Sequence, residues 1–113
     1  MISAVLYTEG GDLTGFRAEG HSGYAEEGSD IVCAAVSVLG CTCVNSLEEF
    51  LGVRVEEHGN KSGLLDFSLP EIPEEKRHDA QLLMKALRRG LSDIQESYPE
   101  YVKIKIEGRR KKR

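Results

Sequence analysis

The feature that most constrains this fold is the segment of residues 31–44, which is apolar on nearly every side of a helix. Ser29 or Asp30 can cap the first turn with a side-chain oxygen, and Gly52 can end the helix, so we expect it to run over about residues 30–51. A helix with almost no polar face is buried, or lies between a sheet and another surface. That other surface is either a second helix and a loop of the same chain, or a second subunit.

Short alternating segments on both sides of this helix predict strands. The expected elements are strands over residues 2–8, 13–20 and 53–57, a turn over residues 58–63, a strand with Leu65, Phe67 and Leu69 on one face, a helix over about residues 73–97, and a strand over residues 102–107. The first two strands should form a hairpin with a bulge near Gly15. The order β-β-α-β-β-α-β predicts an α+β fold, with two helices on a single mixed or antiparallel sheet.

The length of 113 residues suits one domain, which we place at residues 1–108, followed by a basic tail at residues 109–113 that we expect to be disordered. No apolar run reaches the roughly 18 residues of a membrane span, and the first residues lack the basic start and cleavage site of a secretory signal. We therefore expect a cytoplasmic protein with no membrane partner. The three cysteines lie between residues 33 and 43 on one helix, where they cannot form a disulfide framework, so we expect reduced thiols.

Charge is distributed unevenly along the chain. The last five residues carry five positive charges, and because the whole chain has a net charge of −4, residues 1–108 have a net charge of −9. An acidic body suits a basic partner, although solubility alone also explains it. The tail can contact RNA phosphates, but a solubilising end is the simpler interpretation, and we expect no direct RNA binding.

The candidate chemistry lies between residues 20 and 37. Cys33 falls at the third position of a helix that starts after Asp30, where the positive end of the helix dipole favours a thiolate. His21 lies twelve residues earlier, on a glycine-rich loop long enough to return to the helix start, and Ser37 lies one turn beyond Cys33 on the same face. A thiolate beside an imidazole is the minimal machinery of a cysteine protease or acyl transferase. The alternative is a buried structural cysteine and a surface histidine.

A known family shares this pattern. The bacterial ribosomal-processing cysteine protease family, Prp, has a signature that this chain resembles at Gly20-His21-x-Gly23-Tyr24-Ala25 and at Gly28-x-Asp30-Ile31-Val32-Cys33-Ala34-Ala35-Val36-Ser37. The resemblance implies that His21 and Cys33 are the catalytic pair and that Asp30 and Ser37 assist them. It also implies a homodimer whose substrate is the precursor of large-subunit ribosomal protein twenty-seven, from which the enzyme trims a short N-terminal extension before ribosome assembly.

In such an endopeptidase Cys33 attacks the scissile carbonyl, and His21 manages the thiol proton and later protonates the leaving amine. Amide hydrogens at the start of the helix are the expected donors to the oxyanion. Asp30 either orients His21 or only caps the helix. We expect no metal and no organic cofactor.

The remaining candidates have simpler interpretations. Cys41 and Cys43 point roughly 200° apart on a helix, so they cannot hold one ion, and we expect both to fill the core. His58 and His78 lie in polar segments with no zinc-site spacing, and we expect both to be solvated. Tyr24 either stacks on a substrate side chain or anchors its own loop.

Two other functions fit parts of the sequence. A non-enzymatic ribosome-associated binding module would use the acidic body for a basic ribosomal protein and the tail for RNA, but it has no need of a histidine paired with a cysteine. A thiol redox switch is the weaker alternative, because no resolving cysteine is suitably placed near Cys33.

Overall fold

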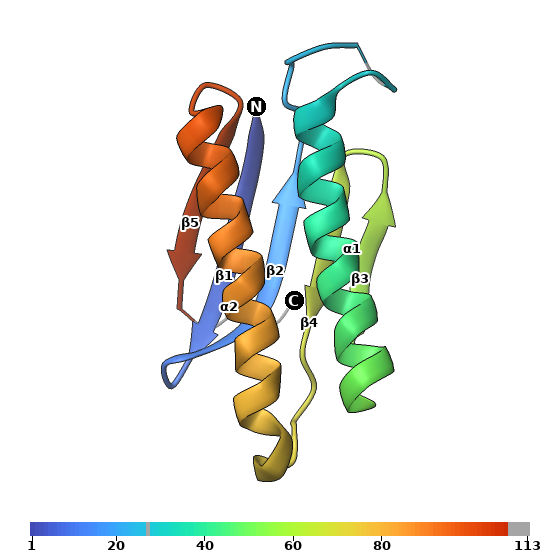
Figure 1. The fold of residues 1–113 in the computed structure, drawn as a ribbon, viewed down its shortest axis with the longest axis vertical. Coiled ribbons are helices and arrows are strands. Elements are labelled where there is room, and N and C mark those ends of the chain that lie inside the picture. Colours follow the sequence, from blue (N-terminus) through green and yellow to red (C-terminus); the bar gives the residue numbers. More distant parts are fainter. Residues whose placement is uncertain (27, 109–113) are drawn as a thin grey trace.

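A computed structural model describes residues 1–26 and 28–108 and contains one five-stranded sheet with two helices lying side by side across one face (Figure 1). The elements are β1 (Ile2–Glu9), β2 (Asp12–Glu19), α1 (Ile31–Leu51), β3 (Glu56–Lys61), β4 (Leu64–Ser68), α2 (Glu74–Ser97) and β5 (Val102–Glu107). The predicted element order and the α+β class are therefore confirmed. The tail at residues 109–113 lies outside the described residues.

The sheet has the strand order β3-β4-β2-β1-β5. Its neighbours pair antiparallel except β1 and β5, which pair parallel because α2 carries the chain back across the sheet before β5 begins. Of the two sheet types left open by the sequence, the mixed one is correct. The order also places β2 and β4 side by side, so the end of β2 and the β3–β4 turn meet at one end of the sheet.

The boundaries of α1 follow its caps. The carboxylate of Asp30 accepts the amide hydrogens of Val32 and Cys33, and Gly52 ends the helix in the left-handed conformation at a φ of 65°. One stripe of the helix packs on the sheet and on α2. Gly40 lies on that stripe, and a Cβ there would collide with Leu65 of β4, so the missing side chain lets α1 approach the sheet closely.

The opposite side of α1 is not covered by residues 1–26 or 28–108. Ile31 and Val38 have 53% and 63% of their surfaces exposed. By length and composition alone α1 is apolar enough to cross a membrane, but its stripe of six buried residues packs as the core helix of a folded domain does. The prediction of a helix with an apolar surface on more than one side is therefore confirmed.

The strand predicted over residues 53–57 is present, but its bounds are wrong. Val53 and Val55 are buried, but they lie in the connection after α1, and β3 begins only at Glu56. The β3–β4 turn is correspondingly short, since Lys61 pairs with Leu64. A strand at the edge of a sheet has no need of alternating apolar residues, so its polar sequence resembles a loop.

A bulge does interrupt the β1–β2 hairpin, one residue from its predicted place. Tyr7 pairs with Gly15 and Thr8 pairs with Leu13, which leaves Thr14 as the extra residue. This bulge shifts the alternation of buried and exposed side chains along β2 by one residue, so that both Leu13 and Phe16 are buried against the helices.

Candidate active site

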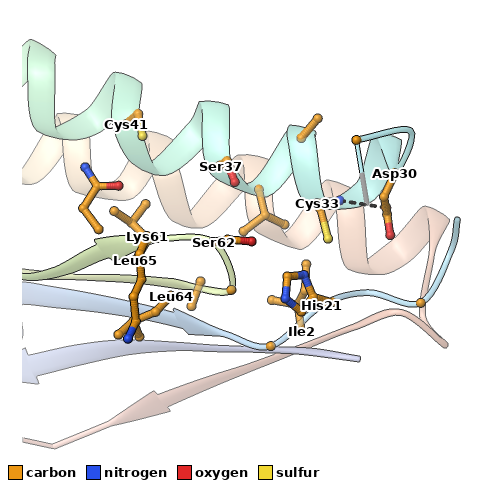
Figure 2. Close-up of a pocket in the computed structure, with 18 of the residues that line it drawn as sticks. Ile2, His21, Asp30, Cys33, Ser37, Cys41, Lys61, Ser62, Leu64 and Leu65 are labelled. Atoms are coloured by element: carbon orange, nitrogen blue, oxygen red, sulfur yellow. Dashed lines mark hydrogen bonds between the residues drawn. The ribbon is translucent and has the colours of Figure 1, made fainter. Parts of the chain in front are cut away.

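A pocket of about 400 Å³ lies where the end of β2, the β3–β4 turn and the first half of α1 meet (Figure 2). His21, Asp30, Cys33 and Ser37 all line it, so the fold brings the four predicted site residues together. Its walls also include apolar side chains from β1, β2, α1 and β4: Ile2, Ala18, Val36, Leu64 and Leu65.

Cys33 occupies the third position of α1, as the sequence predicts. Its amide and that of Val32 both donate to Oδ1 of Asp30 at 3.0 Å, and the Ala34 amide donates to the Asp30 carbonyl at 3.1 Å. These donors are already occupied. The expectation that amides at the start of the helix serve the oxyanion is therefore wrong for Val32 and Cys33, which cannot do so without breaking the cap.

Asp30 is a cap and a loop anchor. Burial by itself would raise the pKa of its carboxyl, but hydrogen bonds from the Ser22 hydroxyl and from the amides of Cys33 and Ala25 lower that pKa to about 2. Within residues 1–26 and 28–108 no hydrogen bond joins Asp30 to His21. The contacts therefore fit capping better than orientation of the imidazole.

His21 follows β2 on the opposite side of the pocket. Gly20 ties this point of the chain to the β3–β4 turn, since its amide donates to the Gly63 carbonyl at 2.8 Å. The imidazole lies over Gly63, where an added Cβ would come within 2.9 Å of Nε2. Figure 2 shows the Cys33 sulfur pointing from the helix toward this ring. The loop thus returns to the helix start, and the two reactive groups face each other.

Ser37 and the other two cysteines divide between pocket and core. Ser37 is exposed and lines the pocket one turn beyond Cys33, as predicted. Cys41 is half-buried: it packs against the core, as predicted, and it also lines the pocket. Cys43 is only 5% exposed and packs against Met84, and burial raises the pKa of its thiol to about 12.

Tyr24 anchors the loop. Its ring packs nearly edge-on against Tyr98 at 5.5 Å and Tyr101 at 5.3 Å between centroids, which are favourable geometries for aromatic pairs. These partners follow α2 and precede β5, far from the loop in sequence. Of the two interpretations left open for Tyr24, the structure supports the anchor.

Ser22 is a residue of the site that the sequence pattern does not predict. Its amide donates to the Cys33 sulfur at 3.3 Å, and its hydroxyl donates to Asp30. Nothing in the local pattern distinguishes this serine from Ser29 of the same loop, because its role depends on how the loop returns to the helix.

The remaining histidines lie outside the pocket. His58 and His78 are both exposed, as predicted, and Nε2 of His58 is 2.7 Å from the Ser68 hydroxyl. Across the described residues no group of three or more histidine, cysteine and carboxylate side chains is arranged to hold a metal ion.

Comparison with known proteins identifies the family. Residues 1–103 match the family described as cysteine protease Prp. The ribosomal processing cysteine protease Prp of Bacillus subtilis strain 168 is 30% identical over 94 residues, which cover 81% of this chain and 84% of that protein. The chain belongs to the Prp family of cysteine proteases. The family resemblance seen in residues 20–37 is thereby confirmed, and with it the assignment as a cysteine endopeptidase.

Solved structures share the fold of this chain. A Streptococcus mutans protein of known crystal structure is 34% identical, with a TM-score of 0.79 over 96% of each chain. Prp from S. aureus, crystallised with a covalently linked product peptide, superposes with a TM-score of 0.83 over 94% of this chain and 99% of that one. Its identity to this chain is 24%, so it supports the fold.

The three thiols should differ in reactivity. At neutral pH we expect iodoacetamide to label Cys33 first and to label Cys43 at least about 100-fold more slowly, because only the thiolate reacts and Cys43 is a buried thiol. Trypsin leaves all three cysteines on the peptide of residues 18–54, so fragment ions of that peptide must assign the label. Equal labelling of Cys33 and Cys43 in the folded protein would contradict the assignment of Cys33 as the reactive thiol.

Proposed function

We propose that this protease removes the N-terminal extension of large-subunit ribosomal protein twenty-seven before ribosome assembly, with Cys33 as the nucleophile and His21 as its acid-base partner. The observation that carries this proposal is the approach of the Cys33 sulfur and the His21 ring from opposite walls of one open pocket. The name of the Bacillus subtilis relative supports a ribosomal substrate. The acidic body of this chain also suits a basic ribosomal protein.

The reaction proceeds in two steps. The Cys33 thiolate attacks the scissile carbonyl carbon, and the imidazolium of His21 gives its proton to the departing amine, which leaves an acyl-enzyme. His21 then accepts a proton from water, whose oxygen attacks the thioester carbonyl and releases the carboxylate product and the Cys33 thiolate. Ser37 lies on the same wall one turn away, where its hydroxyl can contact the bound peptide.

The pocket walls favour an apolar side chain in the substrate. Leu64, Leu65 and Val36 line the volume beside Cys33, and burying a large apolar side chain there contributes about 1.5–3 kcal/mol. We therefore expect the substrate to have hydrophobic residues next to the cleaved bond.

The direct test is incubation with the precursor ribosomal protein and measurement of the product mass. The expected product is shorter by a single N-terminal peptide, and a parallel reaction with Cys33→Ala should leave the precursor intact. Precursor left uncut by active, iodoacetamide-reactive enzyme would refute this substrate. Cleavage at several unrelated sites would refute the specific trimming role.

The proposed compartment is the cytoplasm, where ribosomal proteins are assembled and glutathione keeps thiols reduced. The three cysteines of this chain are all free thiols. One of them is the proposed nucleophile, which would be inactivated by oxidation in an oxidising compartment. Fractionation of cells that express the native protein tests this proposal.

We also propose a homodimer that covers the outer side of α1. Ile31 and Val38 lie exposed on a helix whose other side is the core of the domain, and a two-fold contact would cover the same patch on both subunits. Analytical ultracentrifugation at micromolar protein should give twice the 12.5 kDa mass of one chain. The Val38→Glu variant should sediment as a monomer, whereas Leu82→Glu, at an exposed site on α2, should remain a dimer. A monomer mass that does not change with concentration would rule out the dimer.

A further inference from the structure

We propose that Ser22 is a positioning residue of this active site, which ties the loop that carries His21 to the helix that carries Cys33. Its hydroxyl anchors the loop on Asp30, and its own amide is thereby held against the Cys33 sulfur. The inference rests on the proposed function, in which Cys33 is the nucleophile. The position between His21 and Gly23 is not one of those that carry the family resemblance, so this role comes from the contacts of this chain.

The burial of Ser22 is the first observation. Only 3% of its surface is exposed, although His21 and Gly23 on either side are both exposed. Burying a hydroxyl is unfavourable unless its hydrogen bonds are made. Those of Ser22 are made in both directions, because the hydroxyl donates to Oδ2 of Asp30 and accepts the Tyr24 amide at 3.0 Å. The serine is therefore built into the site and does not project into the solvent.

Asp30 divides its two carboxylate oxygens between the helix and the loop. Oδ1 accepts the amides of Val32 and Cys33, which fixes the carboxylate on the first turn of α1. Oδ2 then faces the loop, where it accepts the Ser22 hydroxyl and, at 3.4 Å, the Ala25 amide. One buried carboxylate thus joins the two segments that supply the catalytic groups.

The amide of Ser22 completes the connection. It donates to the Cys33 sulfur at 3.3 Å, while the nearby amides of Val32 and Cys33 are occupied by the cap. This bond directs the Cys33 sulfur toward the loop and the pocket. The residue directly before Ser22 in the chain is His21, so the sulfur and the imidazole are brought together. Orientation of reacting groups contributes strongly to rate, and small displacements are costly.

The far side of the loop is held independently. The Tyr24 ring packs on Tyr98 and Tyr101, so the loop is fixed on both sides of Ser22: by the aromatic contacts after it and by β2 before it. Loss of the Ser22 hydroxyl should therefore release only the local contact with Asp30. The sulfur and the imidazole would lose their alignment while the pocket walls persist, so the expected effect is on kcat more than on KM.

Hydrogen exchange resolved by NMR tests the contact without any proteolysis. In the wild-type protein the Ser22 amide should exchange at least about tenfold more slowly than the Gly23 amide beside it. In Cys33→Ala the acceptor sulfur is gone, so exchange at Ser22 should accelerate, while the Tyr24 amide, which donates to the Ser22 hydroxyl, keeps its protection. A Ser22 amide that exchanges as fast as Gly23 in the wild type, or that does not respond to Cys33→Ala, would overturn the proposal.

Kinetics test the consequence. We expect Ser22→Ala to lower kcat by at least about tenfold and to change KM by less than about twofold, whereas the matched control Ser29→Ala, an exposed serine of the same loop, keeps wild-type values. Because the hydroxyl acts through Asp30, the double variant with Asp30→Asn should be no slower than the slower single variant. A folded Ser22→Ala enzyme with unchanged kcat, or losses that multiply in the double variant, would refute the role.

The two tests also separate this inference from the proposed function. Should Ser22→Ala fail to fold, the exchange measurements on the wild type and Cys33→Ala still decide the contact. Should the wild-type enzyme leave the precursor ribosomal protein uncut, the proposed substrate fails, while the exchange result still reports whether Ser22 holds the sulfur of Cys33.

Discussion

Replacing Cys33 by alanine is expected to abolish cleavage while leaving the fold intact. The nucleophile of a protease acts as a unit with its base, and its removal costs on the order of 10⁶-fold in kcat. The fold should survive because the cap of α1 uses the Cys33 amide, which alanine retains. The lost sulfur contact is a single bond to a loop amide. Thermal unfolding should therefore report a change within about 1 kcal/mol.

The matched controls for this variant are the other two cysteines. Cys33→Ser should also fail to cleave, because a hydroxyl is a far weaker nucleophile than a thiolate near neutral pH. Cys41→Ala should retain activity, although its side chain lines the pocket and its loss can alter KM. Cys43→Ala should retain activity with some loss of stability, since it leaves a space beside Met84. Full turnover by a folded Cys33→Ala enzyme would exclude Cys33 as the nucleophile.

The sequence predicts best the elements whose ends are determined locally. The caps at Asp30 and Gly52 act through groups within five residues of each, so the bounds of α1 follow from the sequence alone. The apolar excess of this helix is likewise visible in its composition. What the sequence does not settle is which side of the helix faces the sheet, because Val36 and Val38 are equally apolar and only the first is buried.

Edge strands are predicted poorly for a physical reason. Only one side of β3 is paired, and none of its residues is buried. Its position is determined by pairing with β4, and neither hydrophobic period nor propensity records that pairing. The buried Val53 and Val55 alternate like a strand, although they only connect α1 to the sheet.

In the active site, too, features that depend on neighbouring residues are predictable and features that depend on distant residues are not. His21 and Cys33 are predictable as a pair, because residue type, the glycine-rich loop and the start of the helix are all local features. The occupied amides and the role of Ser22 are not predictable, because they depend on the path by which the loop returns to Asp30. Tyr24 shows the same limit, since its partners lie more than 70 residues away in the chain and no pattern near it identifies them.

Replacing His21 by alanine is expected to lower the cleavage rate by about 10²–10⁴-fold, the usual contribution of a general acid-base group. The imidazole is exposed at the pocket and lies over Gly63, so its removal leaves no cavity in the core. The backbone of the loop keeps its ties, because Gly20 still donates to the Gly63 carbonyl and Ser22 still bonds to Asp30. Circular dichroism and thermal unfolding should therefore match the wild type.

The other two histidines are the matched controls for His21→Ala. His58 and His78 are exposed and lie outside the pocket, so His58→Ala and His78→Ala should cleave at the wild-type rate. The dependence of kcat/KM on pH adds a second criterion. A group that accepts and donates a proton produces one limb of that curve, so His21→Ala should lose the limb that His21 produces. A His21→Ala enzyme that is folded and retains both the rate and the full pH profile would show that another group moves the proton. A variant that unfolds but keeps normal specific activity in its folded fraction would make His21 a structural residue.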